Sequence, residues 1–192
     1  ASVAGRLFPS NFSGFTVSVL VCGYLSDRYG RKAALQAALF LYAVGLALLS
    51  CASSLAMVFS AACLVGAGTG AMETVASALA SDLYPTRRVF ILNGVNVAFG
   101  VGAAAGPLAA QLLLNAGVNW RMLYAGVSVF ALAIGLWLTC LRAPGRQGPA
   151  ERLNLAALCA VFRRTDFRVL AAALALYCGA ESGFFTWLPA HV

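Results

Sequence analysis

The stretch that decides the fold lies at residues 23–32 and reads Gly23-Tyr24-Leu25-Ser26-Asp27-Arg28-Tyr29-Gly30-Arg31-Lys32. It is a charged turn in a chain with little charge elsewhere. Of the 192 residues, 61% are hydrophobic and 10% are charged. Soluble domains carry about 25% charged residues. The composition therefore excludes an ordinary soluble domain, and it is too apolar for a disordered chain.

Four long stretches around this turn contain no charged residue: 7–26, 33–72, 89–120 and 122–141. A helix that crosses a bilayer needs about 20 predominantly apolar residues. The second stretch is long enough for two helices, and the polar run Ser50–Ser54 divides it. The apolar run 169–192, which contains one charged residue, adds another helix. We therefore expect an all-α membrane protein with six transmembrane helices. Their expected bounds are Phe8–Ser26, Ala33–Leu49, Leu55–Ser81, Val89–Leu114, Met122–Leu141 and Val169–Val192.

The basic residues predict the orientation of these helices. Of the 13 Lys and Arg residues, all but Arg6 and Arg121 fall on one side of the predicted membrane. An excess of Lys and Arg marks the cytoplasmic side. This places Ala1 outside and the turn Asp27–Lys32 in the cytoplasm of a multi-pass protein of the plasma or inner membrane. Because the arginines lie in separate short loops, they indicate a lipid bilayer and no nucleic acid as partner.

One long charged loop divides the predicted helices into two groups. We expect an incomplete N-terminal helical bundle over 1–141, a cytoplasmic linker over 142–168 and the first helix of a second bundle over 169–192. The six cysteines form no CxxC motif, and His191 is the only histidine, so we expect neither a metal nor a cofactor. The sequence contains no Ser/His or paired-Asp arrangement, so we do not expect an enzyme.

The turn at residues 23–32 closely resembles the signature loop of the major facilitator superfamily, G-x-L-x-D-R-x-G-R-[KR], between that family's second and third helices. The match covers every position of the motif. Physical chemistry agrees with the motif, because Gly23 allows a close helix contact and Gly30 permits a tight reversal. Asp27 can pair with Arg31 or face the N-terminus of a neighbouring helix. Arg28 and Lys32 complete the loop, to which the resemblance assigns a conformational role.

The resemblance extends along the chain. The run Asn119-Trp120-Arg121 is similar to the family's outer loop before its sixth helix, and the charged loop is similar to the linker between its two halves. The six predicted helices then correspond to helices 2–7 of a twelve-helix transporter fold. The resemblance implies a fragment that lacks the first helix and the last five. It also implies transport of a small-molecule substrate, with a proton or sodium as coupling ion.

Two carboxylates lie inside predicted spans, Glu73 and Glu181. An ionisable residue at membrane depth costs a few kcal/mol on insertion scales, and it marks a functional site by default. Glu73 falls near the midplane, where transporter sites lie. The alternative is a structural carboxyl that is hydrogen-bonded between helices.

The residues around both carboxylates resemble the fucose permease group of the superfamily. These are Gly70–Thr74, similar to that group's fourth helix, and Tyr177–Gly183, similar to its seventh. The resemblance implies a proton-coupled sugar-type symporter with Glu73 and Thr74 at the substrate and proton site and Glu181 at the cavity. Asn93 and Asn96 are candidates for binding sugar hydroxyls, or for hydrogen bonds between helices.

A drug/proton antiporter of the same superfamily is the main alternative. Gly102-Ala103-Ala104-Ala105-Gly106-Pro107 resembles the antiporter motif G-x-x-x-G-P, although a close-packed, kinked helix also explains it. Such antiporters carry an Arg in the fourth helix, and Leu55–Ser81 has none. Gly66 and Gly70 are predicted to form a helix-packing face. A non-transporting membrane fragment also stays open.

Overall fold

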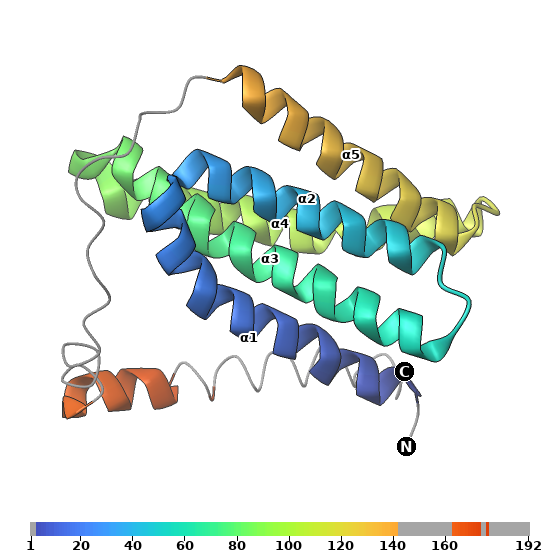
Figure 1. Ribbon diagram of the computed structural model, residues 1–192, viewed down its shortest axis with the longest axis horizontal. Coiled ribbons are helices and arrows are strands. Elements are labelled where there is room, and N and C mark those ends of the chain that lie inside the picture. The colour runs from blue at the N-terminus through green and yellow to red at the C-terminus, as the bar shows by residue number, and fades with distance from the viewer. Residues whose placement is uncertain (1–2, 142–162, 174–175, 177–192) are drawn as a thin grey trace. The chain divides into compact units, whose positions relative to one another are not determined.

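The computed structural model describes residues 3–141, 163–173 and 176, and the regular structure among them is helical (Figure 1). The chain divides into two compact units, Ala1–Ala150 and Glu151–Val192. The first unit contains α1 (Val3–Tyr29), α2 (Arg31–Ser50), α3 (Leu55–Leu83), the short 3-10 turn η1 (Pro85–Arg87), α4 (Arg88–Asn115) and α5 (Trp120–Cys140). In the second unit the described backbone is helical over 165–173.

Among the described residues, four helical segments are long and apolar enough to cross a membrane. They are Arg31–Ser50, Leu55–Leu83, Pro85–Asn115 and Trp120–Cys140. The all-α prediction is therefore confirmed for the described residues, and four of the predicted spans coincide with such segments. The predicted first span lies within α1, which is not one of the four. Most of the predicted span Val169–Val192 lies outside the described residues, so the structure does not establish the predicted number of six.

Short turns join the helices into an up-and-down bundle with two ends (Figure 1). The Gly30 end holds the turn between α1 and α2, and the Ala52 end holds the turn between α2 and α3. Gly30 has a φ of 94°, which only glycine adopts without strain. Ser54 caps α3 by accepting a hydrogen bond from the Met57 backbone N–H, and Asn119 caps α5 by accepting one from that of Arg121.

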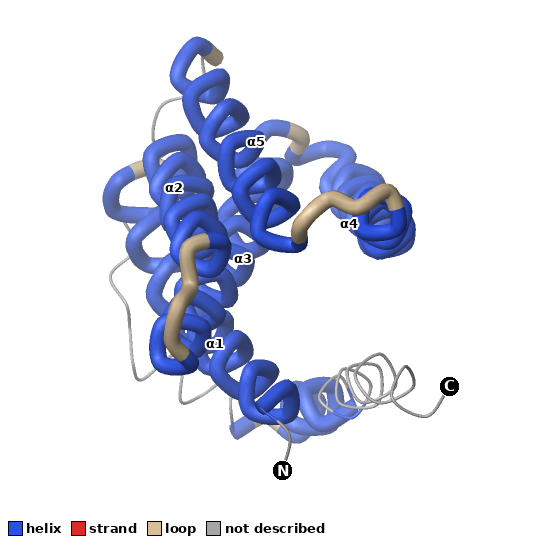
Figure 2. Tube along the Cα trace, turned by 90° about the vertical axis from the view of Figure 1, so that its right-hand side faces the viewer, coloured by secondary structure: helices blue, strands red, loops and turns tan. Residues whose placement is uncertain are grey.

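Helix α3 lies at the centre of the bundle. It packs along α1 on one side and along α2 on the other, and α5 packs on the far side of α2 (Figure 2). The buried core consists mainly of small side chains, including Ala43, Ala61, Ala71 and Val75. Small residues let membrane helices approach closely, where dispersion contacts replace the hydrophobic effect. Helix α4 contacts α3 but buries none of its own residues within the described part of the chain.

Glycines on α3 set the two close contacts. A Cβ at Gly66 would overlap the backbone carbonyl of Asn11 on α1, and a Cβ at Gly70 would lie 2.7 Å from the carbonyl oxygen of Phe15. On the opposite side, a Cβ at Gly68 would lie 2.6 Å from the Cα of Tyr42 on α2. Larger side chains at these positions would push the helices apart.

Polar side chains explain why α1 is less apolar than the other helices. Ser10 Oγ donates to the carbonyl oxygen of Phe59 at 2.8 Å, and Asn11 Nδ2 donates to that of Ala62 at 3.1 Å. Both acceptors lie on α3. These polar groups are therefore satisfied inside the bundle, which is how a membrane helix accommodates them.

Candidate functional site

An arginine-centred network lies at the Gly30 end of the bundle. Arg31 Nη1 lies 2.7 Å from Asp27 Oδ1 and donates to Ser26 Oγ at 2.6 Å. Arg31 Nε donates to Asp82 Oδ2 at 3.0 Å. These four residues, which we name the Arg31 cluster, join the end of α1, the start of α2 and the end of α3.

The Arg31 cluster combines a buried anchor with exposed charges. Ser26 is 1% exposed, and its hydroxyl donates in turn to the Gly23 carbonyl. The side chains of Arg31, Asp27 and Asp82 are 29%, 43% and 41% exposed. Exposed ion pairs contribute about 0–1 kcal/mol to stability. The cluster is therefore suited to hold one arrangement of three helices without dominating the stability of the fold.

The sequence left two partners open for Asp27, and the structure places it on Arg31. Asp82 was missed as a site residue. The available signal was its position, because a carboxylate at the last turn of a membrane helix lies at the same end of the bundle as the signature turn. Arg28 lies at the edge of the cluster, 5.5 Å from the centre of the Tyr29 ring. A Cβ at Gly23 would meet no atom within 4 Å, so the close helix contact predicted at Gly23 is not made among the described residues.

Glu73 and Thr74 lie in the second half of α3. Glu73 is exposed, and Thr74 Oγ1 donates to the carbonyl oxygen of Gly70 at 2.8 Å within the same helix. Asn93 and Asn96 lie exposed on α4. Among these described residues, no hydrogen bond joins Glu73 to either asparagine. Among the described residues, the Glu73 carboxylate therefore has no binding site assembled around it. Glu181 lies outside the described residues.

The Gly–Pro motif lies on the same exposed helix. A Cβ at Gly102 or at Gly106 would meet no atom within 4 Å, and Pro107 lies inside α4 without ending it. In the described part of the chain these glycines contact no neighbouring helix, in contrast to Gly66 and Gly70. No group of three or more His, Cys, Asp and Glu residues that could hold a metal occurs among the described residues.

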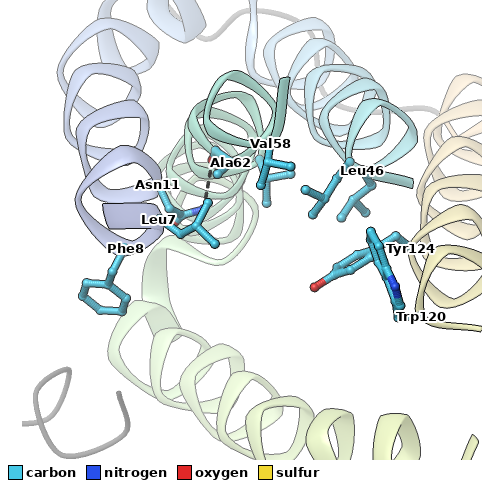
Figure 3. A pocket seen from close by; sticks show the side chains of 10 residues that line it. Leu7, Phe8, Asn11, Leu46, Val58, Ala62, Trp120 and Tyr124 are labelled. Atoms are coloured by element: carbon cyan, nitrogen blue, oxygen red, sulfur yellow. Dashed lines mark hydrogen bonds between the residues drawn. The ribbon is translucent and has the colours of Figure 1, made fainter. Parts of the chain in front are cut away.

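A pocket of about 460 Å³ lies at the Ala52 end, where α1, α2, α3 and α5 meet (Figure 3). We name it the Trp120 pocket. Its lining is mainly apolar and includes Leu7, Leu46, Val58 and Trp120. The polar groups on its wall are few, and the Asn11 amide already donates to α3. An apolar cavity of this size suits a hydrophobic or amphipathic molecule better than a polyhydroxylated one.

The profile of the Major Facilitator Superfamily matches residues 1–192. A triacylglyceride transporter of Mycobacteroides abscessus is 30% identical over 140 residues, which are 72% of this chain and 27% of that protein. A triacylglyceride transporter of Mycolicibacterium smegmatis is 32% identical over 135 residues, 70% and 24% of the two chains.

A third relative is an uncharacterized MFS-type transporter of Mycobacterium tuberculosis, 34% identical over 109 residues, which are 56% of this chain and 16% of that protein. The chain thus spans at most about a quarter of the length of these curated relatives. None of the three is named as a sugar transporter.

Proposed function

Because the chain belongs to the major facilitator superfamily, a family of integral membrane transporters rather than enzymes, we propose that the whole protein is a secondary active transporter that moves a small solute by alternating access. The described bundle forms part of one half of that transporter, with residues 142–168 as the linker and 169–192 as the start of the other half. The Gly30 end faces the cytoplasm and the Ala52 end faces outside, as the distribution of Lys and Arg favours.

The transported solute is an apolar or amphipathic, lipid-like molecule. The observation that carries this proposal is the apolar lining of the Trp120 pocket at the outward end of the bundle. Two relatives named as triacylglyceride transporters support the same substrate class. In the proposed cycle, acyl chains lie against apolar helix surfaces, so that binding depends on buried apolar area and not on a dense set of hydrogen bonds.

A proton-coupled sugar-type symporter is the second candidate. The observation that favours it is Glu73, a carboxylate on a membrane helix whose oxygens are free to bind a proton or a hydroxyl group. Against it stands the separation of the polar groups, since Thr74 donates within α3 and no hydrogen bond links Glu73 to Asn93 or Asn96. Proton coupling through Glu73 is compatible with either substrate class.

Proteoliposomes containing the full-length protein separate the two candidates. A triacylglyceride with a fluorophore that dithionite quenches reports movement between leaflets, and a panel of labelled sugars reports uptake into the lumen. Each is measured with and without a pH gradient. We expect movement of the lipid and no sugar uptake above protein-free vesicles. Sugar uptake would favour the symporter, and export of bulky apolar cations would favour the drug/proton antiporter.

The Arg31 cluster stabilises one conformation of the transport cycle. We expect Asp27→Asn and Asp82→Asn each to lower the transport rate several-fold, because each removes the negative charge of an ion pair with Arg31. The double variant should be little slower than either single variant, because both carboxylates bind one guanidinium. Membrane insertion should be unchanged, since exposed ion pairs contribute little to stability.

These rates are measured in the proteoliposome assay against Asp166→Asn, which alters an exposed carboxylate in the predicted linker. Normal transport by full-length Asp27→Asn and Asp82→Asn would show that the cluster has no part in the cycle. Additive losses in the double variant would show that the two carboxylates act separately.

A further inference from the structure

Helices α2 and α5 are joined at both ends and at the middle. They run antiparallel and side by side (Figure 1). Near the middle, Ser128 Oγ donates to the Ala43 carbonyl oxygen at 2.7 Å, and both residues are buried. At each end the contact is a cation on a backbone carbonyl, and the cation comes from a different helix at each end.

At the Gly30 end the cation is Lys32, in the first turn of α2. Its Nζ donates to the carbonyl oxygens of Thr139 at 2.9 Å and Leu141 at 2.6 Å. These two carbonyls belong to the last turn of α5 and its C-cap. The last carbonyls of a helix have no partner within it and carry its partial negative charge. Lys32 therefore satisfies two acceptors and neutralises the end of α5.

At the Ala52 end the cation is Arg121, in the first turn of α5. Its Nη2 donates to the carbonyl oxygen of Ala52 at 2.8 Å, one residue past the C-cap of α2. Ala52 is 5% exposed, so its carbonyl depends on a protein donor. The guanidinium also lies over the Trp120 ring, 5.0 Å from its centre, in a cation–π contact.

Both cations stand at unfavourable places on their own helices. A positive charge near a helix N-terminus opposes the helix dipole, and neither α2 nor α5 has an acidic residue in its first turn to offset it. The favourable interaction of each cation is with the other helix. The two contacts are thus reciprocal: α2 supplies the cation at one end and α5 supplies it at the other. Neither the signature motif nor the composition predicts the contact of Arg121.

We propose that Lys32 and Arg121 are positioning residues that form a reciprocal clamp, the α2–α5 clamp, which fixes the two helices as one unit during transport. The clamp gives the signature turn a second connection. Arg31 ties the start of α2 to α1 and α3, and the adjacent Lys32 ties it to α5. The proposal goes beyond the proposed function, because it holds whichever solute is carried.

The backbone amides at the two helix ends report on the clamp. The last turn of α5 lies beside the carbonyls that accept from Lys32, and the last turn of α2 lies beside the Ala52 carbonyl that accepts from Arg121. In full-length protein in detergent, the hydrogen-exchange rate of these amides measures how often each helix end opens.

We expect Lys32→Met to raise the exchange rate at the last turn of α5 on the order of tenfold and to leave the last turn of α2 unchanged, since a charged hydrogen bond shifts a local equilibrium by about that factor. Arg121→Met should do the reverse. Lys32→Arg should restore slow exchange at the end of α5, which a purely steric role of the lysine stem would not explain. Arg88→Met, an exposed arginine at the start of α4, is the matched control and should alter neither rate.

Unchanged exchange rates in both methionine variants, or equal increases at both helix ends in each, would overturn the clamp. Hydrogen exchange of the unaltered protein gives a test that needs no variant to fold. The last turn of α5 should exchange more slowly than the last turn of α4, which receives no side-chain donor among the described residues. Faster exchange at the end of α5 would also overturn the proposal.

Discussion

Replacing Gly66 by leucine is expected to abolish the folded bundle. The added Cβ would overlap the Asn11 backbone carbonyl on α1, and backbone cannot move aside as a side-chain end can. Overpacking a close contact costs about 1–3 kcal/mol or more, so Gly66→Ala should already lower the thermal midpoint of the full-length protein in detergent. Gly66→Leu should yield aggregate instead of a monodisperse peak in size-exclusion chromatography.

Gly126→Ala on α5 is the matched control, because a Cβ there would meet no atom within 4 Å. It should behave like the unaltered protein, or be slightly more stable owing to the better helix propensity of alanine. If Gly66→Leu remained monodisperse with the same thermal midpoint as Gly126→Ala, the close packing of α1 on α3 would be wrong.

The positions of the helices follow from the sequence because of a simple constraint. Backbone N–H and C=O groups in lipid must form hydrogen bonds within their own membrane segment. A long uncharged stretch is therefore helical, and the charged residues mark its ends. The predicted spans begin at Ala33, Leu55, Val89 and Met122, and each of these residues lies within two positions of the first residue of α2, α3, α4 or α5. The signature turn likewise fixed the sharp reversal at Gly30.

The partners of the charged residues could not be predicted. Arg31 and Asp82 are 51 positions apart, and Lys32 and Leu141 are 109 apart. Which helix ends meet depends on the packing of small residues along α3, and each helix offers several faces with such residues. Ser10 and Asn11 make the sequence of α1 less apolar. Their partners on α3 could not be predicted either, because these hydrogen bonds depend on how the two helices pack.

The substrate class was the least predictable feature. Short matches around Glu73 and Glu181 resemble a sugar-transporting group, whereas the proposal of a lipid-like solute rests on the apolar pocket and on relatives named as triacylglyceride transporters. A binding cavity is assembled from side chains of several helices, so five residues of one helix constrain it weakly. Glu73 itself is common to both proposals, because a carboxylate at membrane depth can carry a proton whatever the solute is.

Glu73→Gln is therefore expected to abolish proton-driven accumulation of whichever solute the proteoliposome assay identifies. In the proposed cycle, the carboxylate takes up a proton in the outward-facing state and releases it in the inward-facing state. Glutamine keeps the size and hydrogen bonding of the side chain but cannot titrate. Transport with a pH gradient should fall to the level without one, while exchange of solute across the membrane persists, because exchange needs no net proton movement. Glu73→Ala should lose both if the carboxyl also binds the solute, and Asp166→Asn should lose neither. Uphill transport retained by Glu73→Gln would reduce Glu73 to a structural carboxyl and place the coupling site elsewhere in the full-length transporter.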